Sequence, residues 1–166
     1  VAGNYRLGEF QGAILDCQLD RLEEQTTTRE RNGRRLADRL AGIPGLHPQA
    51  RPADCTRHAY PLFMLRLDPA TFGAPREAVL DALRAEGIPC SSGYGYPLPE
   101  QPIFRNKAFG PYIQQSTAAL DYRTAVCPNA ELLCREQAIW IEQRVLLGTA
   151  DDMDAIALIF ERVRAR

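Results

Sequence analysis

The sequence predicts an α/β protein in an α+β arrangement, with one long helix placed before a small domain of strands and helices. The helix is predicted by residues 7–40, where apolar side chains recur every three or four positions, as in an amphipathic helix. The small domain is predicted by a strand–helix–strand order between residues 58 and 91. With 166 residues, the chain is long enough to bury a core.

The composition is that of an ordinary globular protein, with 45% hydrophobic and 25% charged residues. The net charge of −1 creates no general field that would favour nucleic acid or an anionic membrane. The apolar runs are too short to cross a bilayer, and the start does not resemble a signal peptide. The five cysteines are scattered without a C-x-x-C pair, which favours neither a disulfide framework nor a zinc site and suits a reducing cytoplasm.

The start of the long helix carries an unusual charge. Asn4 is suited to capping a helix, so Arg6 is expected in the first turn. A cation there is unfavourable by about 0.3–1 kcal/mol, because a helix N-terminus carries partial positive charge. A bound anion would reverse that effect. Two interpretations stay open: an anion site, or a surface helix whose Arg6 points to water or pairs with Glu9.

The rest of this run predicts a kink and then an apolar edge. Thr26-Thr27-Thr28 is the expected kink, because β-branched residues lose side-chain freedom in a helix. Leu36 and Leu40 continue the apolar edge, and Gly42 and Pro44 end the helix. Acidic residues interleave with five arginines, which predicts a solvated face rather than a nucleic-acid surface. These arginines are Arg29, Arg31, Arg34, Arg35 and Arg39.

Strand and helix signals follow in the second part of the chain. Residues 58–67 are predicted to form a strand in which Pro61 marks an edge or bulge. A helix is expected to start at Pro75 and close at Gly87, and residues 88–91 form a second short strand.

The last third of the chain is less clear until its final helix. Asn129 is predicted to cap a helix over residues 130–137, and residues 139–143 fit either a strand or the end of that helix. The final helix begins at a capping box formed by Thr149 and Asp152. Its predicted buried stripe consists of Met153, Ile156, Ile159, Phe160 and Val163.

Residues 92–104, called the tyrosine loop below, contain so many Gly and Pro residues that no regular element is predicted. Tyr94 and Tyr96 lie among residues that let a backbone approach a partner closely. Such a loop on a rigid scaffold is either a binding site or a packed surface loop, and the residues alone leave both open.

The residues themselves define no catalytic constellation. Sequence motifs of serine hydrolases, zinc proteases and phosphate-binding loops are missing. The only two histidines, His47 and His58, are expected to be a solvated loop residue and a strand-edge residue. Lys107 is the only lysine, and its polar, aromatic surroundings predict a solvated loop residue rather than a cofactor lysine.

Three short motifs resemble a known enzyme family. The run Gly3-Asn4-Tyr5-Arg6 is followed by Phe10-Gln11-Gly12-Ala13-Ile14 and by Gln18-Leu19-Asp20-Arg21-Leu22. Together they resemble the G-N-Y-R, Q-A-A-I and Q-L-x-x-L run of the DegT/StrS family, whose members are pyridoxal-phosphate (PLP) enzymes, mostly aminotransferases. The closing segment, residues 140–156, is similar to the family's as well.

The resemblance implies that this chain is the C-terminal portion of such an enzyme. Residues 1–45 would form a long helix between domains and at a dimer interface, and residues 46–166 a small C-terminal α/β domain. The expected fold is the small domain of a fold-type I PLP-dependent transferase, with a short, mostly antiparallel sheet on which helices pack. The large domain and its cofactor lysine would lie upstream of Val1, so the fragment alone is expected to be inactive.

The resemblance also implies roles for four residues. Asn4 and Arg6 would reach the PLP phosphate of a partner subunit, or an anionic substrate, across a homodimer interface. Tyr94 and Tyr96 would wall the substrate pocket. The tyrosine loop departs from the family form Y-x-P-L-H-x-Q-P because Pro99 stands where many members have His.

The implied reaction is a ping-pong transamination. An amino group from glutamate or glutamine would pass through PLP to a keto-sugar nucleotide or keto-cyclitol, with neither nucleic acid nor a membrane involved. Two alternatives stay open. One is a PLP-dependent sugar dehydratase, in which His replaces the cofactor lysine, and the other is a non-catalytic dimerisation or ligand-binding module.

Overall fold

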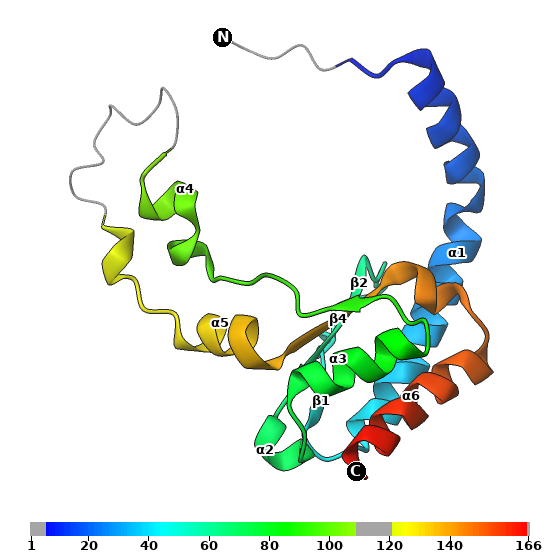
Figure 1. The fold of residues 1–166 in the computed structure, drawn as a ribbon. Helices are drawn as coiled ribbons and strands as arrows, with labels where there is room; N and C mark the ends of the chain where they lie inside the picture. The colour runs from blue at the N-terminus through cyan, green and yellow to red at the C-terminus, as the bar shows by residue number, and fades with distance from the viewer. Residues whose placement is uncertain (1–5, 109–120, 166) are drawn as a thin grey trace.

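A computed structural model of the chain describes residues 6–108 and 121–165. A helix of 33 residues, α1 (Glu9–Ala41), leads into a four-stranded antiparallel sheet. The strands are β1 (Leu46–Pro48), β2 (Leu62–Leu67), β3 (Cys90–Ser91) and β4 (Ala138–Glu142). Figure 1 shows that the C-terminal half of α1 lies at the sheet, whereas its N-terminal half extends away from it.

Helix α1 begins later than the sequence predicted. Its N-cap is Gly8, whose N–H donates to the side-chain oxygen of Gln11 at 3.0 Å, so Arg6 precedes the helix instead of lying in its first turn. Glu9 occupies the first turn, where an acidic residue is favourable. The predicted cap Asn4 lies outside the described residues.

The helix does not break at Thr26-Thr27-Thr28 as predicted, because α1 is continuous there. The hydroxyl oxygens of Thr26 and Thr27 accept hydrogen bonds from Arg29 and Arg57 at 3.0 and 3.2 Å. These contacts hold the side chains in place, and tertiary packing overrides the weak propensity of β-branched residues.

The sheet has the order β1-β2-β4-β3, and every neighbouring pair is antiparallel. Because β2 and β3 both pair antiparallel with β4, they run parallel to each other, with the helix α3 (Arg76–Ala85) between them in sequence. The predicted strand–helix–strand unit therefore exists, but β4 is inserted between its two strands. The mostly antiparallel sheet expected from the resemblance is confirmed.

Strand β2 begins at Leu62 rather than at His58. The Tyr60 N–H donates to His58 Nδ1 at 2.9 Å, and Tyr60 has a positive φ of 47°. This local turn prevents extended pairing before Pro61. Helix α3 likewise starts one residue after its prediction, because Pro75 is the N-cap.

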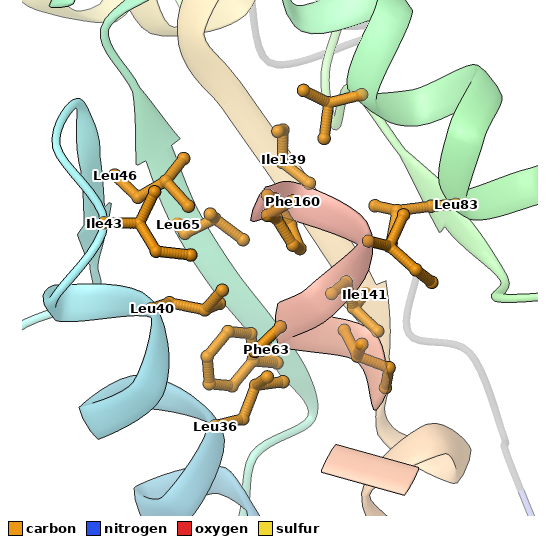
Figure 2. Close-up of a cluster of buried hydrophobic side chains, with 14 of the residues drawn as sticks. Leu36, Leu40, Ile43, Leu46, Phe63, Leu65, Leu83, Ile139, Ile141 and Phe160 are labelled. Carbon is orange, nitrogen blue, oxygen red and sulfur yellow. The ribbon is translucent and has the colours of Figure 1, made fainter. Parts of the chain in front are cut away.

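One face of the sheet forms the core. Side chains along β2 alternate between buried and partly exposed positions, with Phe63, Leu65 and Leu67 buried. Figure 2 shows this buried face of the sheet packed against Leu36 and Leu40 of α1 and Phe160 of α6 (Ala150–Arg164). The capping box predicted for α6 is confirmed, because Asp152 N–H donates to Thr149 Oγ1 at 3.2 Å while Thr149 N–H donates to the Asp152 carboxylate at 2.7 Å.

The described residues between β3 and β4, 92–108 and 121–137, form short helices and turns. These elements are the turn η1 (Leu98–Glu100), α4 (Pro102–Arg105), η4 (Tyr122–Thr124), α5 (Pro128–Leu132) and the π-helical turn η5 (Leu133–Gln137). The predicted cap Asn129 is wrong: Cys127 is the N-cap, and Pro128 takes the first helical position, where its missing N–H has no cost.

Two further short elements belong to the described part of the chain. The helix α2 (Pro69–Phe72) follows β2, and the turn η6 (Gln143–Leu147) connects β4 to α6. The tyrosine loop contains η1 and most of α4, so it is not wholly irregular. No helix among the described residues is long and apolar enough to cross a membrane.

Candidate functional site

The tyrosine loop begins against the open face of the sheet, the face opposite the core. Gly93 has a φ of +75°, and a Cβ built there would lie 2.6 Å from the Trp140 indole. Only glycine combines that backbone conformation with such a close approach. The next residue, Tyr94, meets Trp140 edge to face, with ring centroids 5.0 Å apart. Trp140 therefore fixes the start of the loop.

Both tyrosines remain accessible in the described chain. Tyr94 is 69% exposed and Tyr96 is 60% exposed. They line one cavity of about 660 Å³, together with Leu98 and Gln101 of the loop and Cys134 of η5. The structure thus brings together the two residues predicted to wall a substrate pocket.

A second cavity of about 370 Å³ lies on the open face of the sheet. Tyr94 and Cys134 border it as well, so the two cavities are neighbours. Its polar side chains include His47 of β1 and Arg66 of β2, and Trp140 supplies an aromatic wall. The exposed His47 borders this cavity, whereas His58 shapes the turn before β2.

Arg6 lies apart from the tyrosines. It precedes α1 and is exposed. In Figure 1 the start of α1 (blue) and the segment from η1 to α4 (green) lie on separate limbs of the molecule. Within one chain, then, the candidate phosphate-binding residue and the candidate substrate residues do not form one site.

The N-terminal half of α1 exposes an apolar face. This face consists of six large apolar side chains, five on α1 and one just before its N-cap, whose exposed fractions range from 50% to 89%, with Phe10 the most exposed. These residues are Leu7, Phe10, Ile14, Leu15, Leu19 and Leu22, called the α1 apolar face below. The amphipathic pattern predicts that Leu7, Phe10 and Ile14 are buried, and within the described part of the chain these three side chains have no cover.

Charged side chains fix the middle of α1 to residues 49–57. Glu30 pairs with Arg51 and, at 3.0 Å, with Arg34, and these two partners lower the pKa of Glu30 to about 2. Arg57 pairs with Glu23 at 2.8 Å, which lowers the pKa of Glu23. Arg29 is only 7% exposed and donates to the Ala59 carbonyl at 3.2 Å. The prediction of a solvated arginine face is therefore wrong for Arg29.

Several residues of the site region were not singled out by the sequence. Three of them lie beyond residue 121 and contact the tyrosine loop or border its cavity: Trp140, Cys134 and Arg135. The fourth is Glu100, the loop residue with which Arg135 forms an ion pair. No local signal marked them, because each acts through a contact distant in sequence. Lys107, with a φ of +51°, is not among the residues that line either cavity.

Comparison with known proteins identifies the family to which this chain belongs. The profile of the DegT/DnrJ/EryC1/StrS aminotransferase family matches residues 1–146. The chain is 35% identical over 171 residues to an L-glutamine:2-deoxy-scyllo-inosose aminotransferase of Streptomyces fradiae, covering 98% of this chain and 39% of that protein. It is 29% identical over 167 residues to a 3-amino-5-hydroxybenzoate synthase of Amycolatopsis mediterranei, covering 100% of this chain and 41% of that protein.

Solved structures agree with these relatives. The crystal structure of a 3-amino-5-hydroxybenzoic acid synthase superposes with a TM-score of 0.73 at 30% identity, covering 100% of this chain and 41% of that one. A DegT DnrJ EryC1 StrS aminotransferase from Brucella abortus shares the fold, with a TM-score of 0.71 at 21% identity, 97% of this chain and 37% of that one. The chain spans about two fifths of the length of these proteins.

The fold is that of part of a fold-type I PLP-dependent aminotransferase, with a long helix leading into a small antiparallel domain. The chain belongs to the DegT/DnrJ/EryC1/StrS aminotransferase family. The resemblance noted in the opening motifs is thereby confirmed at the level of the family.

Proposed function

We propose that the complete protein is a PLP-dependent aminotransferase that moves an amino group from glutamate or glutamine to a keto-cyclitol or keto-sugar nucleotide. The observation behind this proposal is the family match over residues 1–146, which includes both the opening motif and the tyrosine loop. The 35% identical relative that acts on an inosose favours a polyhydroxylated cyclic ketone as acceptor.

The described residues fit the rim of a PLP site but not its covalent attachment. Arg6 offers a guanidinium suited to a phosphate dianion. Lys107 lies outside both cavities of the tyrosine loop, so the amine that holds the cofactor must come from elsewhere. When bound, PLP supplies the electron sink and the amino-group carrier.

In this proposal the chain's own residues bind, orient and shield. Arg6 neutralises phosphate charge, and Asn4 offers its side-chain amide as a hydrogen-bond donor to the phosphate oxygens. Tyr94 and Tyr96 wall the acceptor, and their exposed rings offer apolar surface and hydroxyl groups to a sugar-like ring. The loop that bears them also excludes water from the pocket.

The site is proposed to be completed by a second copy of the protein. Arg6 and the tyrosines lie on separate limbs of one chain (Figure 1), so another subunit is needed to bring the two kinds of residue together. The α1 apolar face adjoins Arg6 and offers the surface for that contact. Residues 1–45 would then be interface helix and residues 46–166 the small domain.

The test is a product assay on the complete protein, including whatever sequence precedes Val1. The protein is supplied with PLP, a keto-cyclitol or keto-sugar nucleotide, and glutamine or glutamate that carries ¹⁵N in the transferred amino group. We expect ¹⁵N in the product, detected by mass spectrometry. A product that has lost water without gaining nitrogen would instead identify a dehydratase, and binding without turnover would indicate a ligand-binding module.

A further inference from the structure

The tyrosine loop is attached to the rest of the domain at two points that lie on either side of Tyr96. The first is the contact of Gly93 and Tyr94 with Trp140. The second is an ion pair at the other end of the loop, where Arg135 meets Glu100 with 2.7 Å between Nη2 and Oε1.

The second attachment depends on an arginine whose side chain is largely buried. The Arg76 side chain is only 10% exposed, and it donates to the Cys134 carbonyl at 3.0 Å and to the Arg135 carbonyl at 2.9 Å. These carbonyls belong to η5, a π-helical turn that runs directly into β4. Arg76 thus fixes the turn from which the Arg135 side chain reaches the loop.

From Glu100 the attachment continues to the backbone of the loop. The Glu100 N–H donates to the Pro97 carbonyl at 3.0 Å, which forms the turn η1. The neighbouring Gln101 side chain donates to the Tyr96 carbonyl at 3.2 Å. The main chain of Tyr96 is therefore held while its ring remains exposed.

We propose that Trp140 and the Glu100–Arg135 ion pair are positioning residues that fix the two ends of the tyrosine loop and so set the affinity for the acceptor substrate. The inference rests on the proposed function. π-Helical turns are rare and frequently occur at functional sites, and here the turn places Arg135 against the loop and Cys134 in both cavities. None of these three residues needs to touch the reacting atoms.

The experiment uses the complete enzyme and three variants of the pair: Glu100→Gln, Arg135→Gln, and the exchange Glu100→Arg with Arg135→Glu. The matched control is Asp81→Asn, which removes the exposed ion pair of Asp81 with Arg84 on α3. Two quantities are measured: hydrogen exchange of the peptide covering residues 92–105, and KM and kcat for the acceptor.

We expect each single variant to speed exchange in the tyrosine loop and to raise the acceptor KM about two- to fivefold, since a partly exposed ion pair has a modest effect. The kcat should change less than KM, the exchanged pair should restore both readouts, and Asp81→Asn should change neither. A merely structural pair would leave KM unchanged, or would fail to recover it on exchange.

Variants of the tyrosines separate this inference from the proposed function. If Tyr94→Ala and Tyr96→Ala raise the acceptor KM but the ion-pair variants do not, the positioning role is overturned and the substrate wall stands. If the tyrosine variants also leave KM unchanged, the substrate wall is overturned together with the positioning role. Unchanged hydrogen exchange in the ion-pair variants would by itself overturn the positioning role.

Discussion

The two halves of α1 belong to one continuous helix but have opposite environments. In the C-terminal half, Leu36 and Leu40 are fully buried against the sheet and α6. In the N-terminal half, Phe10 is 89% exposed and Leu19 is 63% exposed. The half with more large apolar residues is thus the half left uncovered. A helical hydrophobic pattern shows which face will be covered, but it does not show which chain or domain covers it.

The largest effect expected from this comparison is loss and recovery of activity in mixed dimers. Alone, Arg6→Ala should lose about 1.5–3 kcal/mol of cofactor affinity, the value of a hydrogen bond to a charged group. A second variant replaces the cofactor lysine expected upstream. Each variant alone is expected to be inactive at limiting PLP. Mixing the two in equal amounts should restore activity in about a quarter of the sites, because half of the dimers are then mixed and each mixed dimer carries one intact site.

The recovery depends on the site being shared between subunits. If Arg6 served the cofactor of its own chain, every site in a mixed dimer would carry one defect, and mixing would restore no activity. An Arg6→Ala protein with unchanged PLP affinity in a titration would remove Arg6 from the site altogether.

The second prediction compares one residue from each half of α1. Leu36→Ala should lower the free energy of unfolding by about 2–5 kcal/mol at every protein concentration, because it opens a cavity in the core. Phe10 is exposed and does not belong to the described hydrophobic core, so the effect of Phe10→Ala should appear only through assembly. Its melting temperature should fall most at low protein concentration.

Calorimetry across a concentration series distinguishes the two cases. A concentration-independent effect of Phe10→Ala, equal in size to that of Leu36→Ala, would show that the α1 apolar face is covered by the same chain, through its upstream part. The two-subunit site would then lose its proposed interface.

The third prediction concerns a polar contact that orients the buried half of α1. Asn32 is 1% exposed, and its side-chain amide donates to the carbonyls of Leu146 and Gly148 at 2.9 and 2.7 Å. Asn32→Ala should cost about 1–3 kcal/mol of unfolding free energy, because it leaves these partly buried carbonyls without the amide donor. Thr27→Ala, at an exposed position of the same helix, is the control and should cost less in the same denaturant titration.

The sequence predicted the elements whose signals are local. The capping box of α6 was found because Thr149 and Asp152 lie three residues apart, and α3 was found from its flanking Pro75 and Gly87. The start of α1 was misplaced because Asn4 and Arg6 suggested a cap that Gly8 and Gln11 supply instead.

The contacts that shape the candidate site could not be found in this way. Trp140 of β4 meets Tyr94, which follows the neighbouring strand β3, and Arg76 meets the carbonyls of η5 far along the chain. Single-sequence patterns report period and punctuation but not which distant segments meet. The tyrosine loop was singled out because an aromatic segment rich in Gly and Pro is a local signal, whereas the role of its tyrosines in a substrate pocket came from the family resemblance and stays a prediction.

The smallest expected effect is a pH dependence at the junction between the two halves of α1. Arg51 and Arg34 lower the pKa of Glu30 from 4.5 to about 2, so the folded state favours the ionised carboxylate. The resulting stabilisation is fully present above pH 4.5 and is lost as the pH falls from 4.5 towards 2. The stability difference between wild type and Glu30→Gln should therefore be constant near neutral pH and shrink over that window.

Arg51→Gln should remove more of this pH dependence than Arg34→Gln, because the hydrogen bond from Arg51 is the largest cause of the low pKa. A difference that stays constant down to pH 2 would show that Glu30 holds residues 49–57 on α1 by packing alone.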